Sequence, residues 1–349
     1  MSKILLLTHP DDVHAQAVEY WLKEFGADYT YFNYELFPRQ AEIAYHFTRQ
    51  RTNFTIDFDG QTLSLGDLTA VWLRRAGLPS PDPNLSKDVQ RYAFNESKAL
   101  LDNLSLLTPK AFWLSSLYAI RIADNKPYQM AQAHKVGFLI PETVFTNNPA
   151  TLMGLDPEYD TLVLKPVHRS ELNLTLSWPQ KLLQMFSKLG KKHYFQGSQQ
   201  SVQYYNSIFT PTHFLNRNQL SDVIDSLAIC PVCIQEHIKP AYELRVTVVG
   251  NDVFACKIKM PDSRKGEVDW RMSNEDNEYT AYSLSKDLEY RCINLIKELG
   301  LSFGCIDLIV NHEGLVYFLE CNPNGQWLWV ENAIGCQISK SIATLLLQE

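Results

Sequence analysis

The sequence contains no excess of basic residues and no long apolar run. Its 349 residues include 32 Lys and Arg against 39 Asp and Glu, a formal net charge of −7. A general nucleic-acid-binding protein needs a basic surface that displaces counterions, so the composition argues against this class and leaves open only a local basic cleft. The opening "MSKILLLTHPDD" has an apolar run of four residues, too short for a signal peptide or a membrane span. We therefore expect a cytoplasmic protein that binds neither nucleic acid nor membrane.

Cysteine usage gives no indication of disulfide bonds. The seven cysteines are an odd number without a secretory signal, so reduced thiols are expected. The motif "CPVC" spans Cys230 to Cys233, and only His237 lies close enough in sequence to help complete a zinc site. The run "CPVCIQEHI" continues as a strand, whereas a redox motif should open a helix. Buried strand cysteines are the favoured interpretation.

The order of strands and helices predicts an α/β fold in three units. Neither an internal repeat nor a low-complexity tract is present. The first unit, residues 1–123, opens as strand, helix and strand, with a helix cap at Asp11 or Asp12. The second unit is residues 124–238 and the third is residues 239–349. The apolar face of the first helix is expected to hold Val18, Trp21, Leu22 and Phe25.

Acidic residues inside apolar strands give the strongest functional signal. In "GCIDLIVNHEGLVYFLECN" two apolar strands flank a turn, and a two-residue loop at Glu313-Gly314 would place Asp307 opposite Glu320. Because strand side chains alternate between faces, Asn322 would share the face of Glu320. A solvated hairpin end is the alternative, but it does not explain acids within apolar strands. Hard oxygen ligands of this kind suit Mg²⁺.

Three cations occupy positions where solvent is not the obvious partner. Lys165 lies in "LVLKPV", Arg245 lies in "YELRVTV" and Lys126 opens a helix. A phosphate would satisfy a buried ammonium or guanidinium group. For each cation taken alone, an intramolecular salt bridge is the alternative. The segment "IQEHIKP" adds Glu236 within an apolar strand, where a carboxylate and free backbone groups can read an adenine edge.

Together these segments resemble the ATP-grasp superfamily of carboxylate-amine ligases. The segments "DNK", "LVLKP", "CIQEHI", "ELRV", "CIDLIV" and "FLECNPNG" follow that family's order between residues 124 and 349. The resemblance implies ATP and Mg²⁺ as cofactors and a pre-ATP-grasp βαβ domain ahead of the ATP-grasp fold. The loop after Lys165, "PVHRSEL", lacks the glycines usual in the superfamily.

The ATP-grasp resemblance also implies a role for each candidate residue. Arg245 and Lys165 correspond to catalytic contacts on the reacting phosphate. In the strand "CKIKM", either Lys257 or Lys259 is expected to meet phosphate or substrate. The implied nucleotide contacts are Lys126, Lys165, Gln235, Glu236, Ile238, Glu243 and Lys257, and the implied metal ligands are Asp307, Glu320 and Asn322.

A narrower resemblance is to the ATP-grasp ligases that mature graspetides, the microviridin-type ribosomal peptides. It rests on "VWLRRAG", "VDWRM" and "FLECNPNGQWLWVE". It implies a macrocyclase that activates Asp or Glu side chains of a precursor peptide as acyl phosphates and joins them to Thr or Ser as esters or to Lys as amides. Arg271 of "DWR" would hold the substrate carboxylate, with a salt bridge to Asp269 as an equal alternative. The precursor's leader is expected on a hairpin at residues 193–208 and a helix at residues 216–227.

Two other functions remain open at this stage. One is an ATP-grasp carboxylate-amine ligase that adds a free amino acid to a peptide or small acid, using the same site. The other is a nucleotide-binding module that senses ATP, which does not need a full phosphoryl-transfer set such as Arg245 and the metal ligands. The sequence does not identify the precursor or the bond type, and it leaves a monomer and a homodimer both open.

Overall fold

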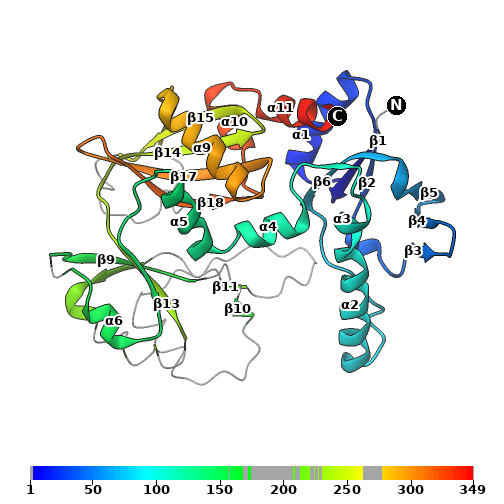
Figure 1. Ribbon diagram of the computed structural model, residues 1–349, viewed down its shortest axis with the longest axis horizontal. Helices are drawn as coiled ribbons and strands as arrows, with labels where there is room; N and C mark the ends of the chain where they lie inside the picture. Colours follow the sequence, from blue (N-terminus) through cyan, green and yellow to red (C-terminus); the bar gives the residue numbers. More distant parts are fainter. Residues whose placement is uncertain are drawn as a thin grey trace.

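The structure is a computed structural model that describes residues 3–156, 158–167, 172–173, 207–208, 213–220, 224, 227, 230–261 and 277–348. Figure 1 shows an N-terminal unit in blue and cyan, a central unit in green, and a C-terminal sheet in yellow and orange. The start and the end of the chain lie side by side, because helix α11 (Ile338–Leu347) packs on helix α1 (Val13–Glu24).

A parallel sheet with the strand order β2-β1-β6-β7 forms the N-terminal unit. Helix α1 begins after Asp12, whose side chain accepts hydrogen bonds from the backbone N–H groups of His14 and Ala15. The predicted strand–helix–strand opening is therefore confirmed. Phe25 was expected on the buried face, but it is the C-cap residue and is 40% exposed. The strands are β1 (Lys3–Thr8), β2 (Asp28–Phe32), β6 (Leu68–Arg75) and β7 (Phe112–Trp113).

The chain between β2 and the end of this unit adds a small antiparallel sheet, β3-β4-β5, and several helices. Helix α2 (Lys87–Asp102) projects from the unit in Figure 1. The sheet consists of β3 (Ala41–Phe47), β4 (Thr52–Phe58) and β5 (Gln61–Ser64). The other elements are η1 (Tyr34–Leu36), η2 (Leu65–Asp67), α3 (Leu104–Leu107) and α4 (Leu117–Ala123).

The central unit is an antiparallel sheet with the order β12-β9-β13-β8. The strand expected to run through "CIQEHI" ends at Glu236. Asn216, expected to begin a helix, ends strand β12, and a short 3-10 helix follows it. The elements are β8 (Thr143–Thr146), α6 (Pro149–Met153), β9 (Thr161–Lys165), β12 (His213–Asn216), η3 (Arg217–Gln219), β13 (Val232–Glu236), and the pair β10 (Leu172–Asn173) and β11 (Ser207–Ile208).

The C-terminal unit is an antiparallel sheet with the order β16-β15-β14-β17-β18. Helices α5 (Lys126–Lys135) and α9 (Lys286–Glu298) pack on one face through a core that includes Leu244 and Phe318. Helices α10 (Leu328–Ile334) and α11 pack on the other face, in a core shared with β1 and α1. The strands are β14 (Pro240–Val249), β15 (Asp252–Lys259), β16 (Glu278–Ala281), β17 (Phe303–Asn311) and β18 (Val316–Asn322).

The β17–β18 hairpin reaches the predicted pairing by a different route. Asp307 lies opposite Glu320, as expected. The predicted two-residue loop is wrong, however, because the Asn311 N–H donates to Leu315 O at 3.0 Å around a three-residue loop. An extra residue, Leu319, then shifts the register between the Leu308–Phe318 pair and the Asp307–Glu320 pair. This bulge keeps Phe318 on the core face and turns Glu320 to the opposite face.

The predicted unit boundaries and thiols can be located in this fold. Residue 123 ends α4, and residue 238 lies between β13 and β14. All seven cysteines are free, which agrees with the expected reduced thiols. Cys233 is buried in β13, whereas Cys230 is exposed and precedes the strand, so only one cysteine of "CPVC" is a buried strand residue. Within the described ranges, no helix is long and apolar enough to cross a bilayer.

Candidate nucleotide and metal site

The three predicted metal ligands lie on one face of the C-terminal sheet. Asp307 on β17 is directly opposite Glu320 on β18, and Asn322 is opposite Cys305. Directly opposite residues project to the same side of an antiparallel sheet. Asp307 is buried, whereas Glu320 and Asn322 are half-buried. Two carboxylates and one amide oxygen are the hard donors that Mg²⁺ prefers, so the residues present fit this metal.

The proposed metal site needs the Asn322 amide as its third ligand in addition to the two carboxylates. Among the described residues no group of three or more His, Cys, Asp or Glu could hold a metal ion by itself. The Asn322 Oδ1 also accepts a hydrogen bond from the Asn324 N–H at 3.1 Å, so the turn that follows β18 orients it. The metal-ligand role of the three residues remains a prediction.

Arg245 and Asp307 form a buried ion pair between neighbouring strands. They are directly opposite on β14 and β17, and Arg245 Nη1 lies 2.8 and 3.0 Å from the two carboxylate oxygens. Arg245 Nη2 donates to Gln326 O at 3.2 Å. The salt-bridge alternative considered for this arginine is therefore present in the structure. A guanidinium group has five N–H donors, so this pair is compatible with the predicted phosphate contact, which stays a prediction.

Lys165 and Lys126 come together at the end of β9. Lys165 Nζ donates to Gln235 Oε1 at 2.6 Å, and Lys126 Nζ donates to Pro166 O at 2.8 Å. Burial raises the pKa of the Cys233 thiol, and the positive charges of Lys165 and Lys126 oppose that rise. Two ammonium groups thus converge on one end of the central sheet, an arrangement that suits a polyphosphate.

The remaining predicted nucleotide contacts divide between the two sheets. Gln235 is buried and donates to Thr143 Oγ1 at 2.8 Å, and Glu236 Oε2 accepts from the Glu142 N–H at 3.1 Å. Ile238 is also buried, in the segment between β13 and β14. These side chains therefore have defined positions at the end of β13 and in the connection to β14, residues 235–239, which is called the hinge below.

Glu243 and Lys257 lie on opposite faces of the C-terminal sheet. Glu243 is buried on β14 two residues before Arg245, so it shares that residue's face. Lys257 is opposite Leu244, and its Nζ lies 4.1 Å from the centre of the Tyr242 ring. The structure does not bring Lys257 together with the Arg245 side of the sheet.

Gln129 is a positioning contact that the sequence did not reveal. It is buried on α5, one turn after Lys126, and its side-chain amide pairs with both backbone groups of Cys321, at 2.7 Å to the carbonyl and 2.9 Å from the N–H. Cys321 lies between Glu320 and Asn322 on the edge strand β18. Gln129 thus fixes the helix that carries Lys126 against the strand that carries two of the predicted metal ligands. No local pattern marks a glutamine for this contact.

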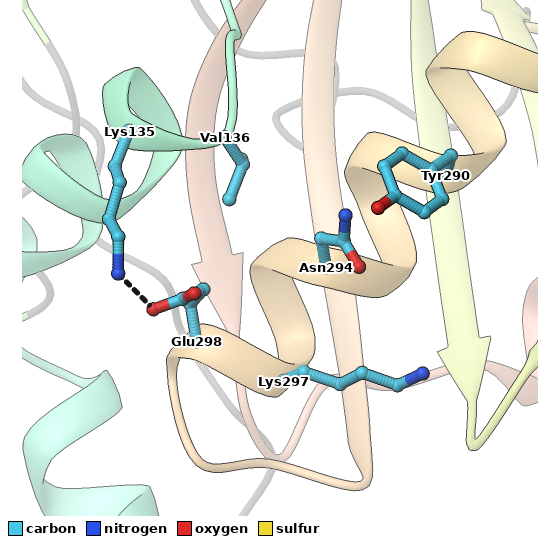
Figure 2. A pocket seen from close by; sticks show the side chains of 6 residues that line it. All are labelled: Lys135, Val136, Tyr290, Asn294, Lys297 and Glu298. Carbon is cyan, nitrogen blue, oxygen red and sulfur yellow. Dashed lines mark hydrogen bonds and ion pairs between the residues drawn. The ribbon is translucent and has the colours of Figure 1, made fainter.

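A hollow between α5 and α9 lies apart from these residues. Figure 2 shows Lys135 and Val136 on one side and Tyr290, Asn294, Lys297 and Glu298 on the other, with an ion pair of 2.6 Å between Lys135 and Glu298. None of the predicted site residues lines it. It is formed by helices on the core face of the sheet, away from Asp307 and Glu320.

Several predicted features lie outside the described residues. These are Arg271 with the rest of "VDWRM", and most of the loop after Lys165. The predicted docking hairpin, including Tyr204 and Tyr205, is also outside them apart from residues 207–208. Their roles stay predictions.

Comparison with sequence families identifies the class. The MvdD pre-ATP grasp domain matches residues 3–121, and the RimK-like ATP-grasp domain matches residues 209–346. No curated protein matches the sequence. The fold and these two domains define an ATP-grasp ligase, an ADP-forming enzyme with a pre-ATP-grasp domain.

Solved structures narrow this assignment. A RiPP-associated ATP-grasp ligase of Chryseobacterium gregarium, solved with ADP and a leader and core peptide, is 28% identical with a TM-score of 0.83. The match covers 99% of this chain and 97% of that chain. Over nearly its whole length the chain is therefore similar to a RiPP-associated ATP-grasp ligase, in keeping with the resemblance that the sequence motifs indicated.

More distant structures support the fold alone. The macrocyclase MdnC of Microcystis aeruginosa MRC, solved with the precursor peptide MdnA, is 23% identical with a TM-score of 0.78 over 100% of both chains. The ATP-grasp ligase PsnB, solved with a minimal precursor, is 21% identical with a TM-score of 0.74 over 99% of this chain and 98% of that chain.

Proposed function

We propose that this protein is a peptide macrocyclase that uses Mg-ATP to join side chains within a ribosomal precursor peptide. The observation that carries the proposal is the full-length likeness to the Chryseobacterium gregarium ligase, which was solved with ADP and both parts of a peptide. The MvdD-type N-terminal domain supports it, because that domain accounts for the "VWLRRAG" segment on β6.

The reaction proceeds in two steps. An Asp or Glu carboxylate of the peptide attacks the γ-phosphorus of ATP, and the bond to ADP breaks to give an acyl phosphate. A Thr or Ser hydroxyl, or a Lys amine, then attacks the acyl carbon, loses its proton and expels phosphate, which leaves an ester or an amide.

The protein's contribution is to position the reactants and neutralise developing charge. Lys126 and Lys165 bind the nucleotide phosphates, and the hinge at Gln235, Glu236 and Ile238 binds adenine. Glu243 binds the ribose. Lys257 or Lys259 contacts phosphate or substrate. Asp307, Glu320 and Asn322 would hold Mg²⁺, and the bound ion would supply positive charge that offsets the negative charge of the phosphates. Arg245 contacts the transferring phosphate, and Arg271 holds the substrate carboxylate.

Product mass tests this function directly. With Mg-ATP and its cognate precursor, the protein should give a product lighter by one water per bond, with fragmentation suppressed between the joined residues. Addition of a free amino acid would make the product heavier instead. A product that gains mass, or one that loses water but fragments as a linear chain, would rule out the macrocyclase. Formation of ADP only in the presence of the peptide separates an enzyme from an ATP sensor.

Site variants connect the reaction to the proposed residues. Glu320→Gln keeps the size and polarity of the side chain but removes a metal-binding charge, so ADP formation should fall by about a hundredfold or more. Near-normal turnover in that variant would overturn the metal assignment. Arg271→Ala should block the loss of water while ATP still binds; normal mass loss would instead favour its salt bridge with Asp269.

The partner and the setting complete the proposal. The partner is a precursor peptide with a leader and a core, processed in the cytoplasm by a monomer or a homodimer of this chain. Light scattering of the purified protein distinguishes the two assemblies. A microviridin-type ring pattern is the finer expectation, and fragmentation of the product tests it.

A further inference from the structure

Arg74 of the segment "VWLRRAG" reaches across from the N-terminal unit to the C-terminal unit. It lies near the end of β6, is 2% exposed, and its Nη1 donates to the backbone carbonyls of Asn324 and Gly325, the latter at 3.5 Å. These carbonyls belong to the turn formed by residues 323–326, directly after β18. A residue of the N-terminal sheet therefore holds the segment adjoining the predicted metal ligands.

An aromatic platform fixes the guanidinium group. Arg74 Cζ lies 4.9 Å from the centre of the Trp327 ring. Trp327 is fully buried, and its indole N–H donates to Ser339 Oγ at 3.1 Å, which in turn donates to Glu331 Oε2 at 2.7 Å. The motif "NPNGQWLWVE" thus contains the turn that Arg74 holds, the ring under it, and the carboxylate that anchors the ring.

The charge of Arg74 is expensive at this position. The carboxylate of Asp12 is 3.8 Å from Arg74 Nε, and burial lowers the pKa of the guanidinium to about 10. Within the described part of the chain, Arg74 Nε and Nη2 make no hydrogen bond. An apolar side chain of similar length would avoid this desolvation cost. The contacts that offset this cost are the Asp12 carboxylate, the Trp327 ring and the bonds from Nη1 to the turn, and only the last of these reach the segment beside the predicted metal ligands.

The turn connects these bonds to the metal ligands. Consecutive carbonyls are held by two arginines, Asn324 and Gly325 by Arg74 and Gln326 by Arg245. The Asn324 N–H in turn donates to Asn322 Oδ1. A shift of the turn must therefore reorient the Asn322 amide.

We propose that Arg74 is a positioning residue for the magnesium site, holding the turn at residues 323–326 so that Asn322 keeps its orientation toward the metal. This inference rests on the proposed function, because it takes Asp307, Glu320 and Asn322 as the metal ligands. It also links the two sequence segments "VWLRRAG" and "NPNGQWLWVE", because Arg74 of the first bonds to the backbone of the second.

Direct metal binding tests the role independently of turnover. Mn²⁺ binds the same oxygen donors as Mg²⁺ and is visible by electron paramagnetic resonance. In the presence of AMPPNP, Arg74→Met should raise the dissociation constant for Mn²⁺ by at least about tenfold, the usual effect of losing a group that orients a metal ligand. Arg74→Lys should also raise it, because an ammonium group has no planar group to place over the Trp327 ring while one of its nitrogens reaches the two carbonyls. Arg75→Lys, at the exposed neighbouring position, is the matched control and should match the wild type.

The Mg²⁺ dependence of turnover and the Mn²⁺ binding of Glu320→Gln complete the test. In turnover assays, the Arg74 variants should require more Mg²⁺ but recover most of kcat at saturating Mg²⁺, a pattern that general destabilisation would not produce. Folded Arg74→Met protein with wild-type Mn²⁺ affinity would overturn the inference, and so would failure of both Arg74 variants to fold. Glu320→Gln serves as the reference: if it retains Mn²⁺ binding, the metal assignment itself fails. If it loses Mn²⁺ while Arg74→Met does not, only the role of Arg74 fails.

Discussion

His14 should make the stability of this protein fall as the solution becomes acidic. The residue lies in the first turn of α1, is 7% exposed, and its ring centre is 4.4 Å from that of Trp327 in an edge-on contact. The pKa of His14 is lowered from an ordinary 6.5 to about 4; burial is the main cause, Arg74 and Arg75 also lower it, and Asp12 opposes them. Protonation would place a second cation beside Arg74 in the core that joins the N- and C-terminal units.

The sign and size of the effect follow from linkage. Between about pH 6.5 and about pH 4 the unfolded chain binds a proton at His14 and the folded chain does not, so the free energy of unfolding decreases as pH falls through this window. The stability is fully present above the upper limit and is lost progressively toward the lower one. A shift of this size corresponds to about 3 kcal/mol in total, of which about 2 kcal/mol is lost between about pH 7 and about pH 5.

Urea unfolding followed by tryptophan fluorescence measures this loss. His14→Gln removes the titrating group, so the variant's unfolding free energy should change by about 2 kcal/mol less than that of the wild type between about pH 7 and about pH 5. Its absolute stability is also expected to decrease because the contact with Trp327 is lost. The informative quantity is therefore the change with pH.

A matched variant shows whether the effect belongs to this site. His9→Gln removes another histidine five residues earlier, but that side chain is 51% exposed. It should leave the pH dependence close to that of the wild type. If His14→Gln loses as much stability as the wild type over the same interval, His14 is not held neutral in the core, and the packing around Trp327 must be revised.

Three other expectations follow from named contacts. Gln129→Leu should destabilise the protein by about 2–4 kcal/mol in urea titrations, because it leaves the N–H and the carbonyl of Cys321 buried without that partner; wild-type stability would contradict the proposed clamp. Gly325→Ala should cost about 1–3 kcal/mol, since a Cβ there would lie 2.5 Å from the Cys305 Sγ and 2.9 Å from the Arg245 Nη2; an unchanged melting temperature would argue against such close packing. Iodoacetamide at neutral pH should label the exposed Cys230 first and spare Cys292, because burial raises the pKa of Cys292 to about 12. Mass spectrometry of the labelled peptides checks this order.

The β17–β18 hairpin shows how far sequence periodicity reaches. A two-residue loop assumed at Glu313-Gly314 placed Asp307 opposite Glu320, and the structure confirms that pairing although it contradicts the loop. The same pairing arises from a two-residue loop without a bulge or from a three-residue loop with one extra residue. No residue near the turn distinguishes the two-residue loop from the three-residue loop with a bulge. Only the need to bury Phe318 on the face opposite Glu320 selects the bulge.

Contacts between residues far apart in the sequence could not be predicted, for a different reason. Arg74 and Asn324 are 250 residues apart, and Gln129 and Cys321 are 192 apart. Both contacts involve backbone groups, which every residue type carries, so no pair of residue types identifies them. The segment "VWLRRAG" was recognised by resemblance, but its role required the fold. By contrast, the strand positions of Lys165 and Arg245 followed from apolar runs interrupted by a cation.

The placement of Trp327 and α11 against the N-terminal sheet has a consequence for biosynthesis. Ile4 and Leu6 of β1 and Val18 of α1 share their core with Trp327, Ile338 and Ile342. Synthesis adds roughly 5–20 residues per second, so the 250 residues between Arg74 and Asn324 delay the arrival of this cover by tens of seconds. During that interval the nascent N-terminal unit exposes part of the apolar face that Trp327 and α11 later cover. A chain ending before Trp327 should therefore bind more 1-anilinonaphthalene-8-sulfonate than the whole protein, and equal binding would show that the early unit covers this face by itself.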